Sequence, residues 1–387
     1  MFSRRTDWRL TPNRFTEAQR EMQRAGREVL DLTLSNPTRA QLAYETGEVL
    51  AALSKPEAMD YDPQPKGLLG ARQGVCEYYR DPDRSNLDPE SVVLTTSTSE
   101  GYSYVLRLLC DPEDEILVPK PSYPLFEFLA DLQDVKLVPY PLLYEHGWQI
   151  DFPSLHQAVS PRTRAVVLVN PNNPTGSYVS SSERRSMNEF CNGHDLSLLV
   201  DEVFLDYAHD GGTRPSFVTN RQTLTFTLSG VSKISGLPQM KLAWVVTSGP
   251  PEKVSAALDR MEVIADTYLS MNAPIQLATP ALLAQRKKIQ PLLMDRVRQN
   301  LQEFDLQLGK QKICQRLDVE GGWFTVLRVP ATQSDEDQAI EILHKTSVLV
   351  HPGHFYDFSG DGYLVLSLIT PSAAFREGIH RVLGLFR

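Results

Sequence analysis

Cysteine is scarce in this sequence. The 387 residues include four cysteines, and no two of them are close enough to form a C-x-x-C pair. Zinc sites and disulfide frameworks usually show such pairs or a denser pattern, so the sequence predicts neither. His351 and His354, in HPGHFYDF, lack companion ligands nearby in the sequence, and we therefore expect no metal site.

Long apolar runs and basic runs are also absent. No uninterrupted apolar stretch is long enough to span a bilayer, and no apolar segment follows the basic N-terminal stretch MFSRRTDWRLTPNRF. The net charge is −9, and the lysines and arginines are scattered, which argues against a nucleic-acid partner. We expect a cytoplasmic protein that binds neither nucleic acid nor membrane.

Short apolar runs alternate with helical patterns between about residues 67 and 270. The runs are rich in Val, Leu and Ile on both faces, as is typical of strands covered on both sides. The seven predicted strands span residues 91–96, 115–120, 135–141, 164–170, 196–203, 223–230 and 242–248. Helix candidates at 99–110, 122–132 and 181–193 lie between several of them. The alternation predicts an α/β fold with a mostly parallel seven-stranded sheet between helices.

The last third of the chain has a different pattern. Long helical segments cover about 251–308, and two strand candidates follow at 323–329 and 362–369. We expect a large cofactor-binding domain over residues 46–275. A smaller α+β domain would combine residues 1–45 with residues 276–387.

Polar residues follow four of the predicted strands, at the edge where open parallel sheets bind ligands. The first is TTSTSEG, whose hydroxyls and helix N-terminus suit a phosphate. NPNNPTG, Asp201 and the loop bearing Lys233 follow three later strands. Each has a plainer interpretation as a helix cap, a turn, a capping acid or a solvated lysine. Four such features on one edge favour an aldehyde cofactor with a phosphate tail and a pyridine nitrogen.

NPNNPTG, then DEVF, then SK with Lys241 eight positions after the lysine resemble the class I/II pyridoxal-phosphate aminotransferases of fold type I. The resemblance covers nearly the whole chain. It implies that Lys233 forms the Schiff base with pyridoxal 5′-phosphate and shuttles the substrate proton. It also implies that Asp201 pairs with the pyridine nitrogen.

The same resemblance assigns the remaining cofactor contacts. Asn173 bonds the ring oxygen and Tyr123 stacks on the ring face. The phosphate is held by Thr98, Ser99 and Lys241, the last in place of the family's usual arginine. Ser232 or Ser229, which flank Gly230, adds a further hydroxyl. Tyr61, in YDPQPKG, reaches the phosphate of a neighbouring subunit, which implies a homodimer. Ser270 and Asn272 belong to a segment that enters the partner's site in this family.

The sequence departs from the family pattern at three places. Gly230 stands where a serine is common, and Phe204 stands where a tyrosine is usual. Val365, in GYLVLS, stands where the family has an arginine that clamps the substrate α-carboxylate. Arg39 is our candidate for that task, with a solvated surface arginine as the alternative. Trp323, in EGGWFTV, either approaches the substrate or packs in the core.

The resemblance implies an aminotransferase that moves an amino group from an L-amino acid to a 2-oxo acid. A β-eliminating C–S lyase uses the same residues and is the alternative. A third possibility is a cofactor-binding regulator. Such proteins usually carry an extra DNA-binding segment, and the sequence gives no sign of one.

Overall fold

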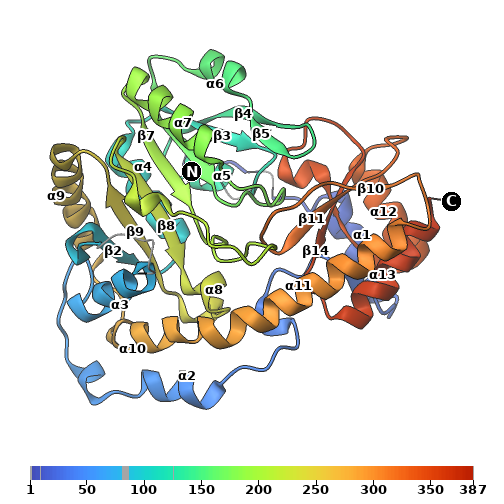
Figure 1. Ribbon diagram of the computed structural model, residues 1–387, viewed down its shortest axis with the longest axis horizontal. Coiled ribbons are helices and arrows are strands. Elements are labelled where there is room, and N and C mark those ends of the chain that lie inside the picture. The colour runs from blue at the N-terminus through green and yellow to red at the C-terminus, as the bar shows by residue number, and fades with distance from the viewer. Residues whose placement is uncertain (1, 9, 81–86, 125, 387) are drawn as a thin grey trace.

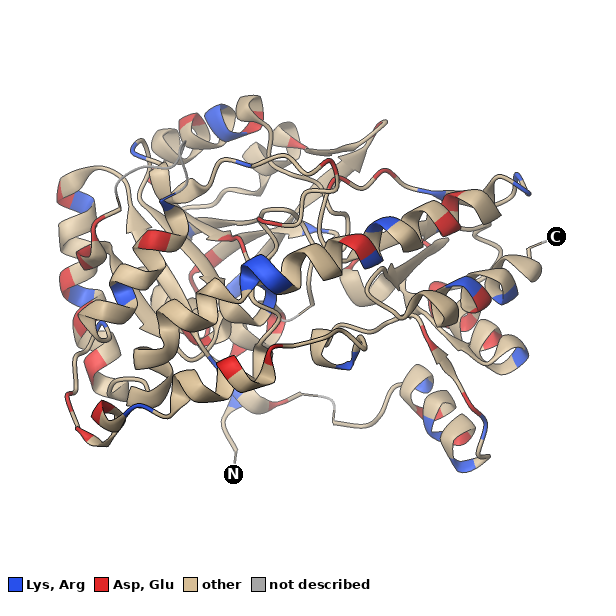
Figure 2. Ribbon diagram, turned by 60° about the horizontal axis from the view of Figure 1, so that its bottom comes forward, with Lys and Arg blue, Asp and Glu red and all other residues tan. Residues whose placement is uncertain are grey.

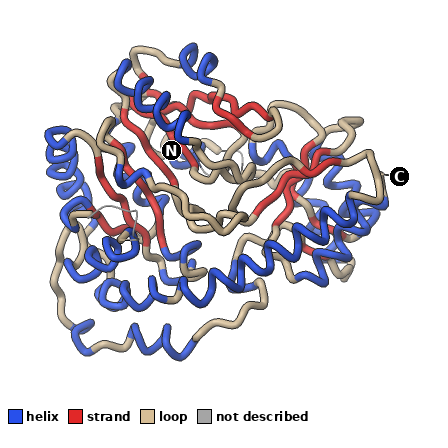
Figure 3. The backbone as a smooth tube through the Cα atoms, viewed as in Figure 1, coloured by secondary structure: helices blue, strands red, loops and turns tan. Residues whose placement is uncertain are grey.

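A computed structural model describes residues 2–8, 10–80, 87–124 and 126–386. Its strands form two groups with loops between them (Figure 3). One group is an eight-stranded sheet, and the other consists of a four-stranded and a two-stranded sheet. The predicted division into residues 46–275 and the rest stays a prediction.

The large sheet contains all seven strands that the sequence predicts. In sheet order its strands are β2 (Val92–Thr95), β9 (Ala243–Ser248), β8 (Thr225–Gly230), β7 (Ser197–Asp201), β6 (Thr163–Val169), β3 (Glu115–Lys120), β4 (Lys136–Tyr144) and β5 (Trp148–Ile150). The pairs from β8 to β4 are parallel, while β9 runs antiparallel to both β8 and β2. The eighth strand, β5, is a three-residue antiparallel edge too short to give a periodic pattern.

Helices cover both faces of this sheet (Figure 1). Alternate residues of β6 belong to different clusters: Ala165 and Val167 pack on one face, Val166 and Leu168 on the other. The first face is covered by α4 (Thr98–Leu109), α5 (Phe126–Asp131) and α9 (Pro251–Tyr268). The second is covered by α6 (Phe152–Ala158), α7 (Ser181–His194), α3 (Leu69–Tyr79) and α10 (Ala273–Ala284). Two-sided burial explains why these strands read as continuous apolar runs.

The smaller sheets join the two ends of the chain. The four-stranded sheet has the order β10 (Gln315–Arg316), β11 (Phe324–Arg328), β14 (Tyr363–Ser367), β13 (His351–Pro352), and all its pairs are antiparallel. The N-terminal strand β1 (Leu30–Asp31) pairs in parallel with β12 (Val348–Leu349). Helix α1 (Arg14–Arg24) packs on α12 (Asp335–Thr346) through Ala18, Met22 and Leu343. The N-terminal segment therefore contacts the C-terminal part of the chain.

Three helices complete the frame. Helix α11 (Arg286–Leu308) runs from α10 toward α13 (Ser372–Gly384) beside the smaller sheet (Figure 1). Helix α2 (Thr46–Leu53) packs on α10. Helix α10, which contains residue 275, packs against α3 and shares a cluster with β2 and β9.

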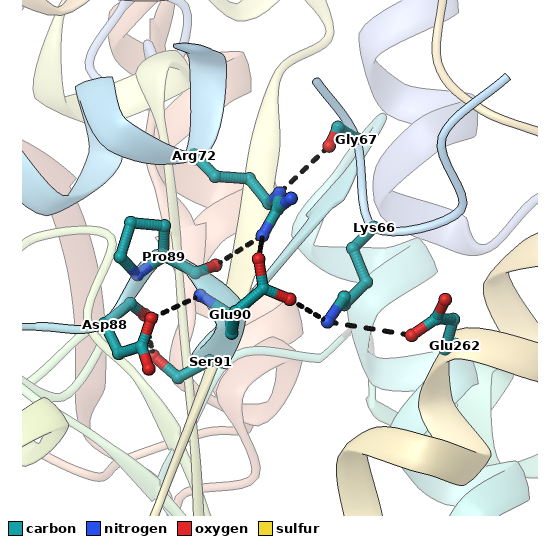
Figure 4. A network of polar contacts seen from close by, with 8 residues as sticks. All are labelled: Lys66, Gly67, Arg72, Asp88, Pro89, Glu90, Ser91 and Glu262. Atoms are coloured by element: carbon teal, nitrogen blue, oxygen red, sulfur yellow. Dashed lines mark hydrogen bonds and ion pairs between the residues drawn. The ribbon is translucent and has the colours of Figure 1, made fainter. Parts of the chain in front are cut away.

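A polar network anchors the loop between Tyr61 and α3 (Figure 4). The buried Arg72 donates to Gly67 O at 2.9 Å and to Glu90 Oε1 at 2.7 Å. Lys66 Nζ lies 2.5 Å from Glu90 Oε2 and 3.6 Å from Glu262 Oε2. These contacts link the loop to residues before β2 and to α9.

Charged residues of both signs are interspersed over the helices in Figure 2. Within the described ranges, no helix is long and apolar enough to cross a membrane. The same residues contain no group of three or more His, Cys, Asp or Glu side chains arranged to hold a metal ion.

Candidate active site

A cavity of about 360 Å³ lies at the carboxyl edge of the large sheet and is lined from both sheets. Seven of the predicted site residues line it: Thr98, Ser99, Tyr123, Asn173, Asp201, Ser232 and Lys233. Phe324 of β11 and His351 of β13 contribute from the smaller sheet. The volume falls within the roughly 300–1,000 Å³ that is typical of small-molecule sites.

Lys233 lies in α8 (Val231–Ile234), a single helical turn directly after β8. The Tyr207 hydroxyl donates to the Lys233 carbonyl oxygen at 2.6 Å, which holds this turn in place. The Lys233 ammonium lies 5.1 Å from the Trp323 ring centroid and 5.6 Å from that of Phe204. Burial among these rings lowers the pKa of the Lys233 amine to about 8, against the opposing charge of Asp201.

Asp201 ends β7, and both of its carboxylate oxygens accept hydrogen bonds. The Val203 N–H donates to Oδ1 at 3.1 Å, and the Tyr102 hydroxyl donates to Oδ2 at 3.3 Å. Burial nevertheless raises the pKa of Asp201 to about 6, while these two bonds and Lys233 act in the opposite direction. A buried acid and a buried amine thus share one cavity, an arrangement common at functional sites.

The asparagines of NPNNPTG have separate tasks. Asn170 Oδ1 accepts from the Val179 N–H at 3.0 Å, and Asn172 Nδ2 donates to Pro121 O at 3.0 Å. These two bonds hold the loop. Asn173 lines the cavity, and its buried Oδ1 has no hydrogen-bond partner among the described residues. The structure therefore leaves one amide of this motif for a ligand.

The hydroxyls of TTSTSEG are divided in the same way. Thr95 Oγ1 donates to Ser97 O, and Ser97 caps α4 by accepting from the Glu100 N–H. The Glu100 carboxylate accepts from Thr96. Thr98 and Ser99, in the first turn of α4, line the cavity. They bring hydroxyls and the helix N-terminus to the same place, which suits an anion.

Four predicted site residues do not line this cavity. Lys241 is exposed and has a φ of 51° just after the 3₁₀ turn Pro238–Met240. Arg39 is exposed and does not line the cavity. Tyr61 is 76% exposed and lines a different cavity, of about 370 Å³, together with Ser270 and Asn272. Trp323 is fully buried beside Lys233 in the core cluster.

The structure places all three departures from the family pattern. A Cβ built at Gly230 would lie 2.8 Å from Leu242 O and 2.9 Å from the Ala243 Cβ, so neighbouring β9 leaves no room for a serine. The Phe204 ring packs at 5.1 Å from the Trp323 ring and lines the cavity. Val365 is buried in β14, where it pairs with Val326 and His351.

Several lining residues had no motif to reveal them. Ser35, Phe324, Phe355 and Tyr356 reach the cavity through tertiary packing, whereas Val203 lies within DEVF. In the sequence, His351 stands out only as a possible metal ligand, although HPG directly follows a short apolar run. The position of His351 between this run and Pro352-Gly353 is the one sequence feature that points to the cavity.

The family described as Aminotransferase class I and II matches residues 28–375. An alanine aminotransferase of Mycobacterium tuberculosis is 30% identical over 274 residues, which is 70% of this chain and 63% of that protein. The match thus spans less than two thirds of the relative. The glutamate-pyruvate aminotransferase AlaA of Haemophilus influenzae is 25% identical over 366 residues, covering 90% of this chain and 88% of that protein.

Solved structures agree on the fold. An alanine aminotransferase from Pyrococcus furiosus has a TM-score of 0.88 at 22% identity, covering 96% of this chain and 95% of the other. A tyrosine aminotransferase from Leishmania infantum has a TM-score of 0.83 at 20% identity, covering 98% of each chain. These matches confirm the expected α/β fold of a fold type I transferase with a smaller domain. With residues 28–375 matched, the chain belongs to the class I and II aminotransferase family.

Proposed function

We propose that this protein is a pyridoxal-phosphate-dependent aminotransferase that moves an amino group from an L-amino acid to a 2-oxo acid. The observation that carries the proposal is the shared cavity of Lys233 and Asp201, with an amine of lowered pKa and an acid of raised pKa. The names of the relatives, alanine aminotransferase and glutamate-pyruvate aminotransferase, support the same reaction.

The residues of the cavity fit the cofactor. The side-chain amide of Asn173, which lines the cavity, would donate from Nδ2 to the ring oxygen, and Tyr123 would stack on the ring. Thr98, Ser99 and Ser232 would hold the phosphate at the N-terminus of α4. Lys233 would attach the aldehyde carbon through its amine. Lys241 would add a positive charge near the phosphate from outside the cavity lining.

Bound pyridoxal phosphate supplies an electron-accepting ring that stabilises negative charge at the substrate α-carbon. Asp201 would hold a proton at the ring nitrogen, and its bonds from Val203 and Tyr102 orient the carboxylate for this task. Lys233 would take the proton from the α-carbon, since a pKa of about 8 leaves part of the amine neutral near pH 7. The rings of Phe204 and Trp323 keep water away from that amine.

The active unit would be a cytoplasmic homodimer. Tyr61 does not line the cavity of its own chain that holds Lys233, and it shares a different cavity with Ser270 and Asn272. This grouping supports a role for the three side chains in the site of a neighbouring subunit.

Two measurements test the proposed function. Purified protein mixed with pyridoxal phosphate should gain a visible absorption band, and borohydride should fix the cofactor on the peptide that contains Lys233. Protein that stays colourless contradicts cofactor binding. With the cofactor bound, amino transfer from an L-amino acid to a 2-oxo acid supports the aminotransferase. Release of ammonia and pyruvate from cystathionine without an added 2-oxo acid would instead identify the C–S lyase.

Tyr102→Phe tests the positioning of Asp201. The variant loses the hydroxyl that donates to Asp201 Oδ2, and this bond favours the charged carboxylate. The pKa of Asp201 should therefore rise further, and the acidic limb of the kcat/KM profile should move upward by about one pH unit. Phe should fit here because Tyr102 packs edge-to-face on Phe126 at 5.3 Å. An unchanged acidic limb would show that the hydroxyl does not assist Asp201.

A further inference from the structure

The cavity has little positive charge for a substrate that carries a carboxylate. Among its lining residues, Lys233 and His351 are the two whose side chains can carry a positive charge. Lys233 is committed to the cofactor in the proposed function, on which this inference rests. A carboxylate placed among phenylalanine rings would lose its hydrating water, and without a hydrogen-bond donor nothing would offset that cost. His351 is therefore the remaining lining residue whose side chain can carry a positive charge beside a carboxylate.

His351 is the cross-strand neighbour of Val365. In the small sheet, Val365 pairs with His351 on β13 and with Val326 on β11. Directly paired residues project to the same face of a sheet, and Phe324 shares that face because it lies two residues before Val326. His351 and Phe324 both line the cavity. The imidazole is thus adjacent to the position where the family has its arginine.

The His351 ring is held in one orientation. Its Nδ1 lies 3.0 Å from the Tyr356 hydroxyl, and its ring packs 5.8 Å from the Phe355 ring. The backbone of Tyr356 accepts a hydrogen bond from the Ser122 N–H at 2.9 Å, which links the pair to the loop carrying Tyr123. Tyr356 also lines the cavity. When the Tyr356 hydroxyl donates to Nδ1, the neutral ring carries its proton on Nε2 and can donate it.

We infer that His351, oriented by Tyr356, binds the substrate carboxylate in place of the missing arginine. The subsite donates one hydrogen bond, from the Nε2–H of the ring, instead of the two parallel bonds of a guanidinium. Burial lowers the pKa of free His351 to about 4, with Asp31 opposing, so the ring is neutral before substrate arrives. Binding then relies on the hydrogen bond that the ring donates to the carboxylate. The negative charge of a bound carboxylate in turn favours the protonated form of the ring.

His351→Ala tests this subsite with two matched substrates, L-phenylalanine and 2-phenylethylamine, which differ by the carboxylate. Loss of hydrogen bonds to a charged group should raise the KM for L-phenylalanine about 10- to 100-fold, with kcat changed less than about threefold. The reaction of 2-phenylethylamine should be unchanged. Tyr356→Phe should give a smaller rise, and His351→Asn, which keeps a donor, should recover part of the loss.

His354→Ala is the matched control, because this exposed histidine is three residues away and outside the cavity lining. It should leave both KM values within about twofold of the wild type. Adding Val365→Arg to His351→Ala should lower the KM for L-phenylalanine again. If His351→Ala does not fold, His351→Asn and Tyr356→Phe decide the question through the same substrate pair.

Two results overturn the inference. One is an unchanged KM for L-phenylalanine in His351→Ala, with Arg39→Ala raising it instead, which would assign the carboxylate to Arg39. The other is an equal loss for both substrates, which would indicate a structural role. The absorption band of the bound cofactor distinguishes these two results from failure of the proposed function, in which no band would form. A variant that keeps the band retains the cofactor site whatever its KM.

Discussion

Lys233→Ala is expected to abolish covalent retention of pyridoxal phosphate and to lower kcat/KM about 10⁴-fold or more. The side chain supplies both the amine that holds the aldehyde and the base that moves the substrate proton. Among the lining residues of the cavity, no other side chain is a primary amine. The measurement is the visible absorption band and its fixation by borohydride, followed by turnover with an amino acid and a 2-oxo acid.

Lys241→Ala is the comparison for this prediction. Lys241 is exposed at the end of the same loop, and its proposed task is to add charge near the phosphate. The variant should bind the cofactor more weakly, yet borohydride should still fix it on Lys233. If Lys233→Ala keeps a trappable band at another lysine, the assignment of Lys233 is wrong.

Burial sets the protonation of the two ionisable groups at the centre of this site. Asp201 and Lys233 are both shifted toward their neutral forms because the surrounding rings and strands exclude water. The shifts suit proton transfer near pH 7, but they also mean that the cofactor-free protein holds two costly charges. The two side chains that serve the reaction in the cofactor-bound protein therefore lower the stability of the cofactor-free protein.

The sheet could be predicted from the sequence because its strands are buried on both faces. Runs such as that of β6, with Ala165, Val167 and Val169 on one face and Val166 and Leu168 on the other, leave a continuous apolar pattern. The edge strand β5 was missed because three residues carry no period. Pairing of β1 with β12 joins residues more than 300 positions apart, and no local pattern encodes such a contact.

The cofactor side of the cavity was predictable because its residues directly follow strands. Thr98, Asn173, Asp201 and Lys233 all come just after apolar runs, and parallel strands bring these ends together. The substrate side was not, because Ser35, Phe324 and Tyr356 come from separate segments that meet only through packing. His351 belongs to this second group, since it reaches the cavity through the register between β13 and β14.

Asp201→Asn is expected to lower activity about 10³-fold while leaving the fold intact. The amide can still accept a hydrogen bond from the Val203 N–H and can donate to the Tyr102 hydroxyl, so the local bonds have partners. It carries no charge, so it cannot hold a proton at the ring nitrogen as the carboxylate does. The readout is kcat with the cofactor bound, beside the absorption band that reports cofactor binding.

The same variant should stabilise the cofactor-free protein, and the sign follows from the pKa of Asp201. Folding raises it from 3.8 to about 6, so the neutral acid is favoured in the folded state. Its contribution to stability is fully present below pH 4 and is lost as the pH rises through 6. Asparagine stays neutral, so Asp201→Asn should match the wild type near pH 4 and exceed it by about 2 kcal/mol at pH 7.5. Urea unfolding of both proteins at the two pH values measures this difference. A variant less stable than the wild type at pH 7.5 would mean that the charged Asp201 stabilises the empty site.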